Sequence, residues 1–282
     1  MDEISPRSLL LNGTWFNDES LPERILRINK GSHTEKDVLL QKVFFFLEQW
    51  LNDDPCITLQ TSGSTGAPKQ IRIKKEFMLN SAIMTGNYFG LRQGMNALLC
   101  LSPDFIAGKM MVLRSMVFKL NLITSSTESN PIKNLEVDID FAAMVPLQVA
   151  MTLQKNPDKL DRIKTLIIGG GPLSISLEES LQSKSAKCWH TYGMTETVSH
   201  IALRPINGID RSSWFAPLPG VIVSLDKRGC LTVNAPLISE DVVITNDLAK
   251  LNGQKFQITG RIDEVIVSAG LKLHPGKIEK KT

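Results

Sequence analysis

Residues 141–183 read FAAMVPLQVAMTLQKNPDKLDRIKTLIIGGGPLSISLEESLQS, and this stretch decides the fold class. Short β-rich runs alternate in it with segments whose apolar residues recur at helical intervals. In chain order we expect a strand at 141–145, a helix at 146–154, a strand at 165–168, a Gly-Gly-Gly-Pro turn at 169–172, and a helix at 173–183 with Ser174 as a possible cap. Strands that alternate with helices favour an α/β sheet.

The same alternation extends toward the N-terminus. Residues 34–51 place apolar side chains at helical intervals, and Asn52-Asp53-Asp54-Pro55 ends that helix. Two β-rich runs at 56–60 and 70–73 then enclose a Ser/Thr/Gly loop, and a helix at 75–90 and a buried strand at 97–101 follow. We therefore expect residues 1–205 to form one α/β core.

After about Pro205 the alternation of strands and helices gives way to short β-rich runs. Residues 221–225 and 230–233 flank an Asp226-Lys227-Arg228-Gly229 turn and make a β-hairpin. More short β runs follow up to about Gly260. We expect a smaller β-rich subdomain at 206–260.

Composition excludes several classes of protein. The net charge of the 282 residues is +3, and residues 271–282, with four lysines and one glutamate, carry all of it. Residues 1–270 carry equal numbers of basic and acidic side chains, which argues against a nucleic-acid-binding surface. Four scattered cysteines indicate reduced thiols and no structural zinc, and no apolar run is long enough for a signal peptide or a bilayer span. We expect a cytoplasmic protein that binds neither nucleic acid nor membrane.

The loop between the two early β runs, Thr61-Ser62-Gly63-Ser64-Thr65-Gly66-Ala67-Pro68-Lys69, has the composition of a phosphate-binding site. Its hydroxyls and glycines let donors converge on a polyanion, and its lysine adds a point charge. It is not a Walker A sequence, because Pro68 precedes Lys69 where that motif has glycine. The alternative is a flexible surface turn, which has no need of the Pro-Lys ending.

Two further motifs occur downstream. His190-Thr191-Tyr192-Gly193-Met194-Thr195-Glu196-Thr197 offers an aromatic face for a base and a carboxylate for Mg²⁺. Taken alone, this motif is more simply explained by a core tyrosine at 192 and an ordinary acidic residue at a helix start at 196. In 258–270, Arg261 follows a glycine and can reach phosphate or ribose oxygens, although a surface ion pair on a β edge is the simpler interpretation.

Taken in order, the three motifs resemble the adenylate-forming superfamily of acyl- and aryl-CoA synthetases, and the resemblance covers about residues 56–280. The family's signatures are T-S-G-[ST]-T-G-x-P-K, Y-G-x-T-E, T-G-D and G-R-x-D. Thr245-Asn246-Asp247 matches the third with asparagine in place of glycine, and Gly169–Pro172 is similar to the family's adenine-contacting turn. The resemblance implies layered α/β sheets with a small β-rich subdomain.

The resemblance also implies a two-step reaction with ATP, Mg²⁺ and coenzyme A. A carboxylic acid attacks the α-phosphate of ATP, giving an acyl-adenylate and pyrophosphate, and the thiol of coenzyme A then displaces AMP. Thr65, Lys69 and Glu196 are the implied catalytic residues, with Thr65 and Glu196 near Mg²⁺. The implied nucleotide-binding residues are Thr61, Ser62, Gly63, Ser64, Thr65, Gly66, Lys69, Gly170, Gly171, Pro172, Tyr192, Gly193, Thr195, Asp247 and Arg261.

The stretch Ala107–Ser115 points to the acid. It resembles the o-succinylbenzoate–CoA ligases of menaquinone synthesis, whose substrate has two carboxylates on an aromatic frame. Lys109 or Arg114 can pair with the carboxylate that does not react while Met110 and Met111 pack against the ring. Alternatively, Lys109 is solvated and the methionines are ordinary core. Ser199 and His200 are further candidates for the acid's oxygens, and His200 is as readily a surface histidine.

In this family a hinge falls at the aspartate of G-R-x-D, here Asp263, and a smaller lid domain follows it. Residues 261–282 match the hinge and the start of that lid, so we expect the lid and its late lysine to be missing from this chain. Two other functions stay open. One is an adenylating enzyme for a different acid or for a carrier protein, and the other is a nucleotide-binding remnant without turnover.

Overall fold

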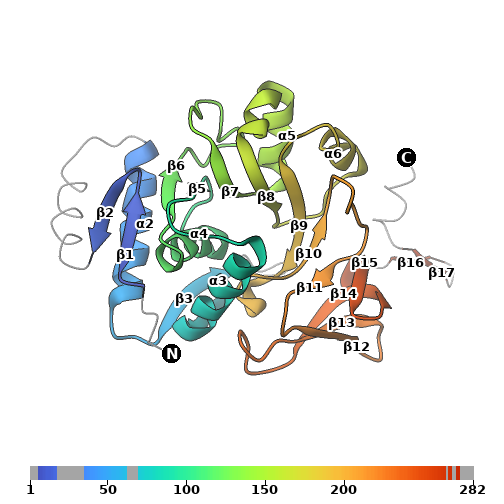
Figure 1. Cartoon of the computed structure of the whole chain (residues 1–282). Coiled ribbons are helices and arrows are strands. Elements are labelled where there is room, and N and C mark those ends of the chain that lie inside the picture. Colours follow the sequence, from blue (N-terminus) through green and yellow to red (C-terminus); the bar gives the residue numbers. More distant parts are fainter. Residues whose placement is uncertain (1–5, 18–34, 62–68, 265, 269–270, 274–282) are drawn as a thin grey trace.

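The computed structural model describes residues 6–17, 35–61, 69–264, 266–268 and 271–273. Within these ranges the strands form one sheet of nine strands, one of four, and two two-stranded hairpins (Figure 1). The large sheet contains β1 (Ser8–Leu11), β2 (Thr14–Asn17), β5 (Asn96–Leu99), β6 (Asn121–Thr124), β7 (Ile139–Met144), β8 (Ile163–Ile168), β9 (Lys187–Gly193), β10 (His200–Pro205) and β11 (Ala216–Pro217). Their order is β11-β10-β9-β8-β7-β5-β6-β1-β2.

The large sheet is parallel in its centre. The pairs from β1 through β6, β5, β7 and β8 to β9 are parallel, whereas β2, β10 and β11 pair antiparallel at the two edges. The parallel strands therefore end at one common edge of the sheet, where a ligand can contact several of them.

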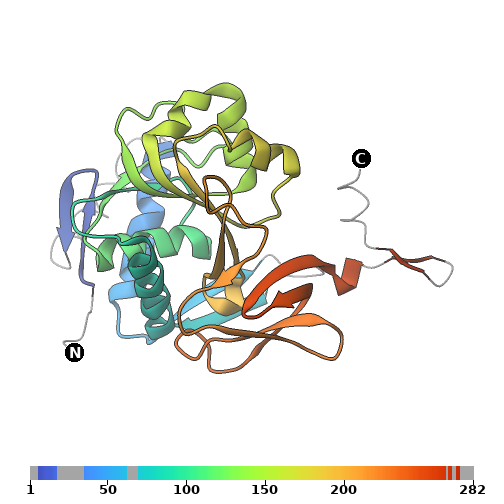
Figure 2. The same cartoon turned by 45° about the vertical axis from the view of Figure 1, so that its right-hand side comes forward.

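Both faces of the large sheet are covered by helices (Figure 2). Successive residues of β7 alternate between two core clusters: Phe141 and Ala143 belong to one, and Ala142 and Met144 belong to the other. This period of two is why the strands read as continuous apolar runs. The first cluster is completed by α2 (Glu35–Leu51), α3 (Lys75–Phe89) and α4 (Ile106–Val117), and the second by α5 (Pro146–Lys155), the 3₁₀ helix η1 (Pro157–Arg162) and α6 (Ile175–Ser180).

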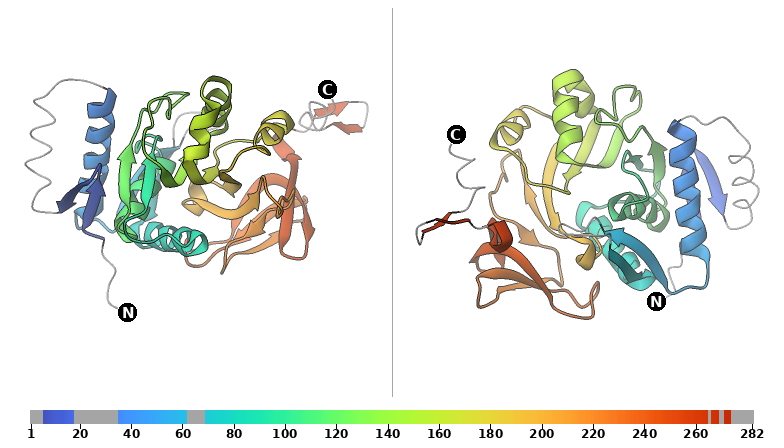
Figure 3. Two further views of the ribbon diagram at one scale, coloured as in Figure 1. Left: turned by 45° about the horizontal axis from the view of Figure 1, so that its top comes forward. Right: turned by 180° about the vertical axis from the view of Figure 1, so that it is seen from behind.

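The small sheet is antiparallel and packs on the same core as α3 (Figure 3). It consists of β12 (Ile222–Leu225), β13 (Cys230–Asn234), β14 (Val243–Asn252) and β15 (Lys255–Arg261). Val223, Leu231 and Val233 join the first cluster, and the Asn80 side chain of α3 donates to the Leu237 carbonyl at 2.8 Å. The two hairpins are β3 (Cys56–Thr61) with β4 (Lys69–Lys74), and β16 (Ile266–Ser268) with β17 (Leu271–Leu273).

The α/β class expected from the sequence is confirmed, and so are most of the expected elements. The cap is also confirmed, since Ser174 Oγ accepts from the Leu177 amide at 3.2 Å. The helix expected at 173–183 is shorter, and the strand expected at 97–101 stops at Leu99. Helix α4 carries no amphipathic signal because every residue from Gly108 to Met116 is buried. No helix in the described part of the chain is both long and apolar enough to cross a bilayer.

Candidate functional site

A cavity of about 250 Å³ lies at the carboxyl ends of β5, β7, β8 and β9. Ligands of open α/β sheets bind at this edge because loops from several parallel strands converge there. The cavity collects six of the residues singled out in the sequence, namely Arg114, Gly170, Gly193, Thr195, Ser199 and His200. Apolar side chains, among them Leu101, Ile106, Ile167 and Val198, make up much of the remaining wall.

The glycine at 193 is required by close packing between β9 and β10. A Cβ at this position would lie 2.3 Å from the Ser199 carbonyl oxygen and 2.5 Å from His200 Cα. Gly170 is required for a different reason, because its φ of +82° is a conformation that other residues rarely adopt. Any other residue at 170 or 193 would therefore force the backbone that lines the cavity to shift.

Arg114 supplies the charge of the cavity. Its Nη2 donates to Ser199 Oγ at 2.8 Å, and its Nη1 lies 3.8 Å from the sulfur of Met111. The Nε atom is buried without a partner, and among the described residues no carboxylate pairs with this guanidinium. Burial lowers the pKa of Arg114 from its ordinary 12.5 to about 9. A buried cation without a counter-ion is costly, so an anionic ligand would stabilise it.

Ser199, His200 and Thr85 form a hydrogen-bonded chain behind Arg114. Thr85 Oγ1 donates to the Ser81 carbonyl at 3.0 Å and lies 3.2 Å from His200 Nε2. The Thr85 hydroxyl proton is therefore committed, so His200 Nε2 carries the hydrogen and Nδ1 accepts from Ser199 Oγ at 3.4 Å. Burial, with a smaller contribution from Arg114, holds the pKa of His200 well below its ordinary value. His200 is buried, not a surface histidine.

Thr85 was not predicted from the sequence. The available signal was a polar residue on the apolar face of α3, three residues after the buried Ala82.

Lys109 does not lie at the cavity, contrary to one of our two expectations for it. Its Nζ lies 3.4 Å from Gln49 Oε1 and 5.1 Å from the centre of the Phe46 ring, so it faces α2. Lys109 precedes Arg114 by five residues, which rotates the two side chains about 140° apart on a helix. Nor is Lys109 solvated, since it is 4% exposed and burial lowers its pKa. Met110 and Met111 are fully buried in the first core cluster and do not line the cavity.

A second group of expected residues joins the large sheet to the small one. The Tyr192 hydroxyl on β9 donates to Asp247 Oδ2 at 2.5 Å, and Arg261 Nη1 donates to Asp247 Oδ1 at 3.0 Å. Arg261 also pairs with Asp263 at 2.7 Å. Burial, reinforced by the Asp247 charge, raises the pKa of Tyr192. The contacts fix the Asp247 carboxylate between a phenol and a guanidinium.

The Thr-Glu-Thr sequence forms a one-turn 3₁₀ helix, η2 (Thr195–Thr197). Thr197 holds this turn, because its Oγ1 accepts from the Met194 amide at 3.0 Å and donates to the Ser199 carbonyl at 2.8 Å. Thr195 lines the cavity, and the neighbouring Glu196 is exposed. An exposed carboxylate at this position suits Mg²⁺, which binds through one or two carboxylates and keeps several waters. The residues described contain no group of three or more His, Cys, Asp or Glu side chains that could hold a metal by themselves.

The phosphate loop is described only at its ends. Thr61 ends β3, Lys69 begins β4, and these two residues pair in the antiparallel register. The expected contacts at Ser62, Gly63, Ser64, Thr65 and Gly66 lie outside the described residues. Pro172 is exposed in the turn between β8 and α6, and Gly171 precedes it with its carbonyl oxygen 3.1 Å from His190 Nε2.

Comparison with known proteins gives one family. The profile of the family described as AMP-binding enzyme matches residues 17–230. The crystal structure of an acyl-CoA synthetase (AMP-forming)/AMP-acid ligase II-like protein from Dyadobacter fermentans is 35% identical, with a TM-score of 0.76 over 90% of this chain and 73% of that chain.

Several more distant relatives are named for one acid, 2-succinylbenzoate. A 2-succinylbenzoate–CoA ligase of Bacillus licheniformis is 25% identical over 80% of this chain and 54% of its own length. The o-succinylbenzoate coenzyme A synthetase of Bacillus subtilis, solved with ATP and magnesium, shares the fold at 18% identity, with a TM-score of 0.68 over 92% of this chain and 66% of that one. The chain spans about half the length of the curated relatives it matches.

Proposed function

Because the chain belongs to the AMP-binding enzyme family, we propose that it takes part in activating a carboxylic acid with ATP for transfer to coenzyme A. An oxygen of the acid attacks the α-phosphorus of ATP, the bond to the bridging oxygen breaks, and pyrophosphate leaves. The thiolate of coenzyme A then attacks the carbonyl carbon, and AMP leaves. Because acid and nucleotide repel each other, the protein's main task is to position them and neutralise their charge.

We propose o-succinylbenzoate as the acid, and the carrying observation is Arg114. The buried guanidinium has no carboxylate partner among the described residues, so binding of an anion would stabilise it. The cavity beside it has largely apolar walls. A molecule with one carboxylate on an aromatic ring and another on a side chain fits these features: one carboxylate pairs with Arg114, the ring packs on the apolar wall, and the other carboxylate reacts. Ser199 and His200 hold Arg114 in place for this contact.

The nucleotide is proposed to bind beside the acid. Gly170, Gly171, Pro172, Tyr192 and Gly193 would face the base, and Asp247 the ribose hydroxyls. Arg261 would contact ribose and phosphate, and Lys69 with the hydroxyls of 61–65 the outer phosphates. Glu196, with Thr65, would hold Mg²⁺, which neutralises phosphate charge when bound. Most of these residues belong to the proposed 1–205 core, Asp247 to the 206–260 subdomain, and Asp263 to the proposed hinge.

Two measurements on this chain test the proposal. Calorimetry should show binding of ATP and of o-succinylbenzoate, with benzoate and fatty acids binding at least tenfold more weakly. Pyrophosphate exchange should then depend on o-succinylbenzoate and be abolished by Glu196→Gln without loss of the fold. Glu179→Gln, which alters an exposed glutamate on α6, is the matched control and should retain exchange.

The contrary outcomes are distinct. Exchange at near wild-type rate in Glu196→Gln would remove that residue from the site. Preference for another acid would retain the reaction class and replace the substrate. ATP binding without exchange for any acid, both in this chain and in one extended past Thr282, would favour a nucleotide-binding protein without turnover.

A further inference from the structure

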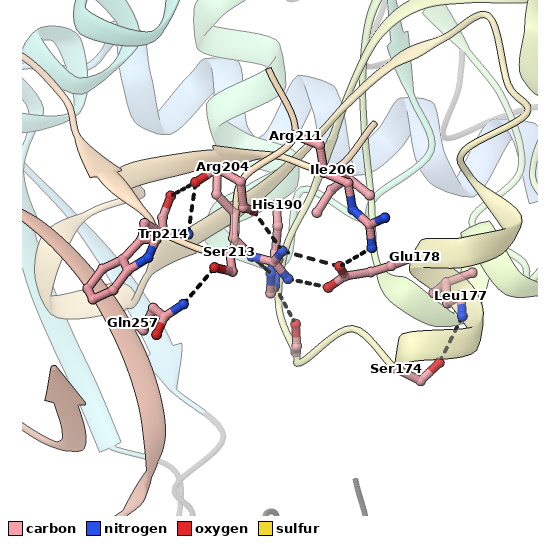
Figure 4. A network of polar contacts seen from close by, with 12 residues as sticks. Ser174, Leu177, Glu178, His190, Arg204, Ile206, Arg211, Ser213, Trp214 and Gln257 are labelled. Atoms are coloured by element: carbon pink, nitrogen blue, oxygen red, sulfur yellow. Dashed lines mark hydrogen bonds and ion pairs between the residues drawn. The ribbon is translucent and has the colours of Figure 1, made fainter. Parts of the chain in front are cut away.

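A largely buried polar network links α6, β10 and β9 to the Gly169–Pro172 turn (Figure 4). Arg204 on β10 stands at its centre: Nη1 donates to Glu178 Oε2 at 3.3 Å, and Nη2 contacts the other oxygen of the same carboxylate. Arg204 Nε points to His190 Nδ1 at 3.3 Å, and His190 Nε2 lies 3.1 Å from the Gly171 carbonyl oxygen. The contacts run in sequence from α6 through β10 and β9 to the turn.

The network fixes the tautomer of His190. A guanidinium can only donate, so Nδ1 must accept from Arg204 and Nε2 must carry the hydrogen that Gly171 accepts. Phe215 keeps both side chains in place, with its ring centre 5.1 Å from the His190 ring and 5.4 Å from Arg204 Cζ. Donation to Gly171 is therefore the state that the surrounding residues favour.

The hydrogen bond from His190 matters for Gly171 because close packing does not fix the position of this residue, as it does for Gly169. A Cβ on Gly169 would lie 2.3 Å from Thr191 Oγ1, so Gly169 is fixed by close packing against β9. A Cβ on Gly171 would meet only Pro146 Cγ, at 3.8 Å, so crowding does not hold it. The His190 contact is the polar restraint that the structure gives to its carbonyl.

We propose that His190, Arg204 and Glu178 are positioning residues of the nucleotide site: they orient the glycine turn so that its backbone receives the base of ATP. This inference rests on the proposed function, because that function places the nucleotide at the turn. Of the three residues, Glu178 lies farthest along the contacts from Gly171, and it acts on the turn through Arg204 and His190. Its carboxylate fixes Arg204 in an ion pair whose side chains are 11% and 15% exposed, and Arg204 in turn fixes His190.

Two substitutions at residue 190 separate the contact with Arg204 from the contact with the Gly171 carbonyl. In His190→Gln the amide nitrogen takes the place of Nε2 and can still donate to Gly171. In His190→Asn the shorter amide can accept from Arg204 but does not reach Gly171. We expect His190→Gln to bind ATP within about threefold of wild type and His190→Asn to bind it about tenfold more weakly, the effect of losing one hydrogen bond.

The ion pair is tested in the same way. Glu178→Gln should weaken ATP binding about three- to fivefold, because the neutral amide holds Arg204 less firmly. Lys184→Met is the matched control: it removes a contact of a lysine that is 12% exposed, pairs with Asp161 and has no contact with the turn. It should leave ATP affinity unchanged. Calorimetry on the full chain should also show that o-succinylbenzoate affinity stays within twofold in all four variants, which a general loss of structure would not allow.

The outcomes divide cleanly. Equal ATP affinity in His190→Asn and wild type would overturn the proposal, and so would an equal loss in Lys184→Met and Glu178→Gln. A wild-type chain that does not bind ATP would overturn the proposed function itself, which distinguishes that failure from a failure of the positioning network.

Discussion

Replacing Arg114 with methionine should stabilise the ligand-free protein and remove its affinity for the acid. Methionine is unbranched and apolar, and it can pack against the neighbouring Met111 sulfur. The wild-type protein carries a guanidinium that is 2% exposed and has no carboxylate partner among the described residues. The substitution removes the unfavourable desolvation free energy of this buried charge, which in the wild type is offset only when an anion binds.

The size of the effect follows from the lowered pKa. Burial shifts the pKa of Arg114 from 12.5 to about 9, and one pKa unit corresponds to about 1.4 kcal/mol, so the buried charge costs up to about 5 kcal/mol at neutral pH. The variant loses a charged hydrogen bond to Ser199 that contributes about 1.5–3 kcal/mol. We expect a net stabilisation of about 2–4 kcal/mol, within the range measured when buried ion pairs are replaced by apolar residues.

Binding should change in the opposite direction. A buried charged contact between a ligand carboxylate and Arg114 is worth about 2–5 kcal/mol when one partner is truncated. The variant should therefore bind o-succinylbenzoate at least about 30-fold more weakly. Benzoate, which has a single carboxylate, should lose less than o-succinylbenzoate.

Urea unfolding with and without o-succinylbenzoate measures both effects. The acid should raise the midpoint of the wild type and leave that of Arg114→Met unchanged. Arg162→Met is the control, because it removes an arginine that is 40% exposed and paired with Asp138, and it should change stability by less than about 0.5 kcal/mol. An Arg114→Met protein that is less stable than the wild type by more than about 1 kcal/mol and binds the acid with unchanged affinity would contradict an unpaired, anion-binding Arg114.

Three further predictions concern residues around the cavity. His200 is neutral in the fold because burial and Arg114 lower its pKa, whereas the unfolded chain takes up a proton below about pH 6.5, so wild-type stability should fall with acidification. Unfolding at pH 7 and pH 5 should show a smaller loss in His200→Gln than in wild type, and equal losses would count against a buried neutral His200. Gly193→Ala should lower stability by at least about 2 kcal/mol because its Cβ would lie 2.3 Å from a backbone oxygen, while Gly171→Ala, which has room, should cost less than about 1 kcal/mol; similar melting temperatures for the two would contradict this. Tyr192→Phe should weaken ATP binding about three- to tenfold by freeing the Asp247 carboxylate, and unchanged calorimetric affinity would show that the phenol does not orient it.

The sequence by itself determined the order of the elements and the α/β class. Residues 141–183 repeat a strand and a helix, and local periodicity is enough to show this because it reflects the burial of each element separately. The glycines at 170 and 193 could also be recognised as special. The reasons for them, a positive φ and an approach of 2.3 Å, are visible only in the structure.

The tertiary structure decided which side chains meet. Lys109 and Arg114 are equally basic and lie on one helix, yet the rotation of α4 turns one toward Phe46 and the other into the cavity. The contacts of Thr85 with His200, and of Glu178 with Arg204, join residues 115 and 26 positions apart in the chain. Such pairings leave no local pattern, because the free energy that selects them comes from burial and charge satisfaction in the assembled fold, not from the propensity of any one segment.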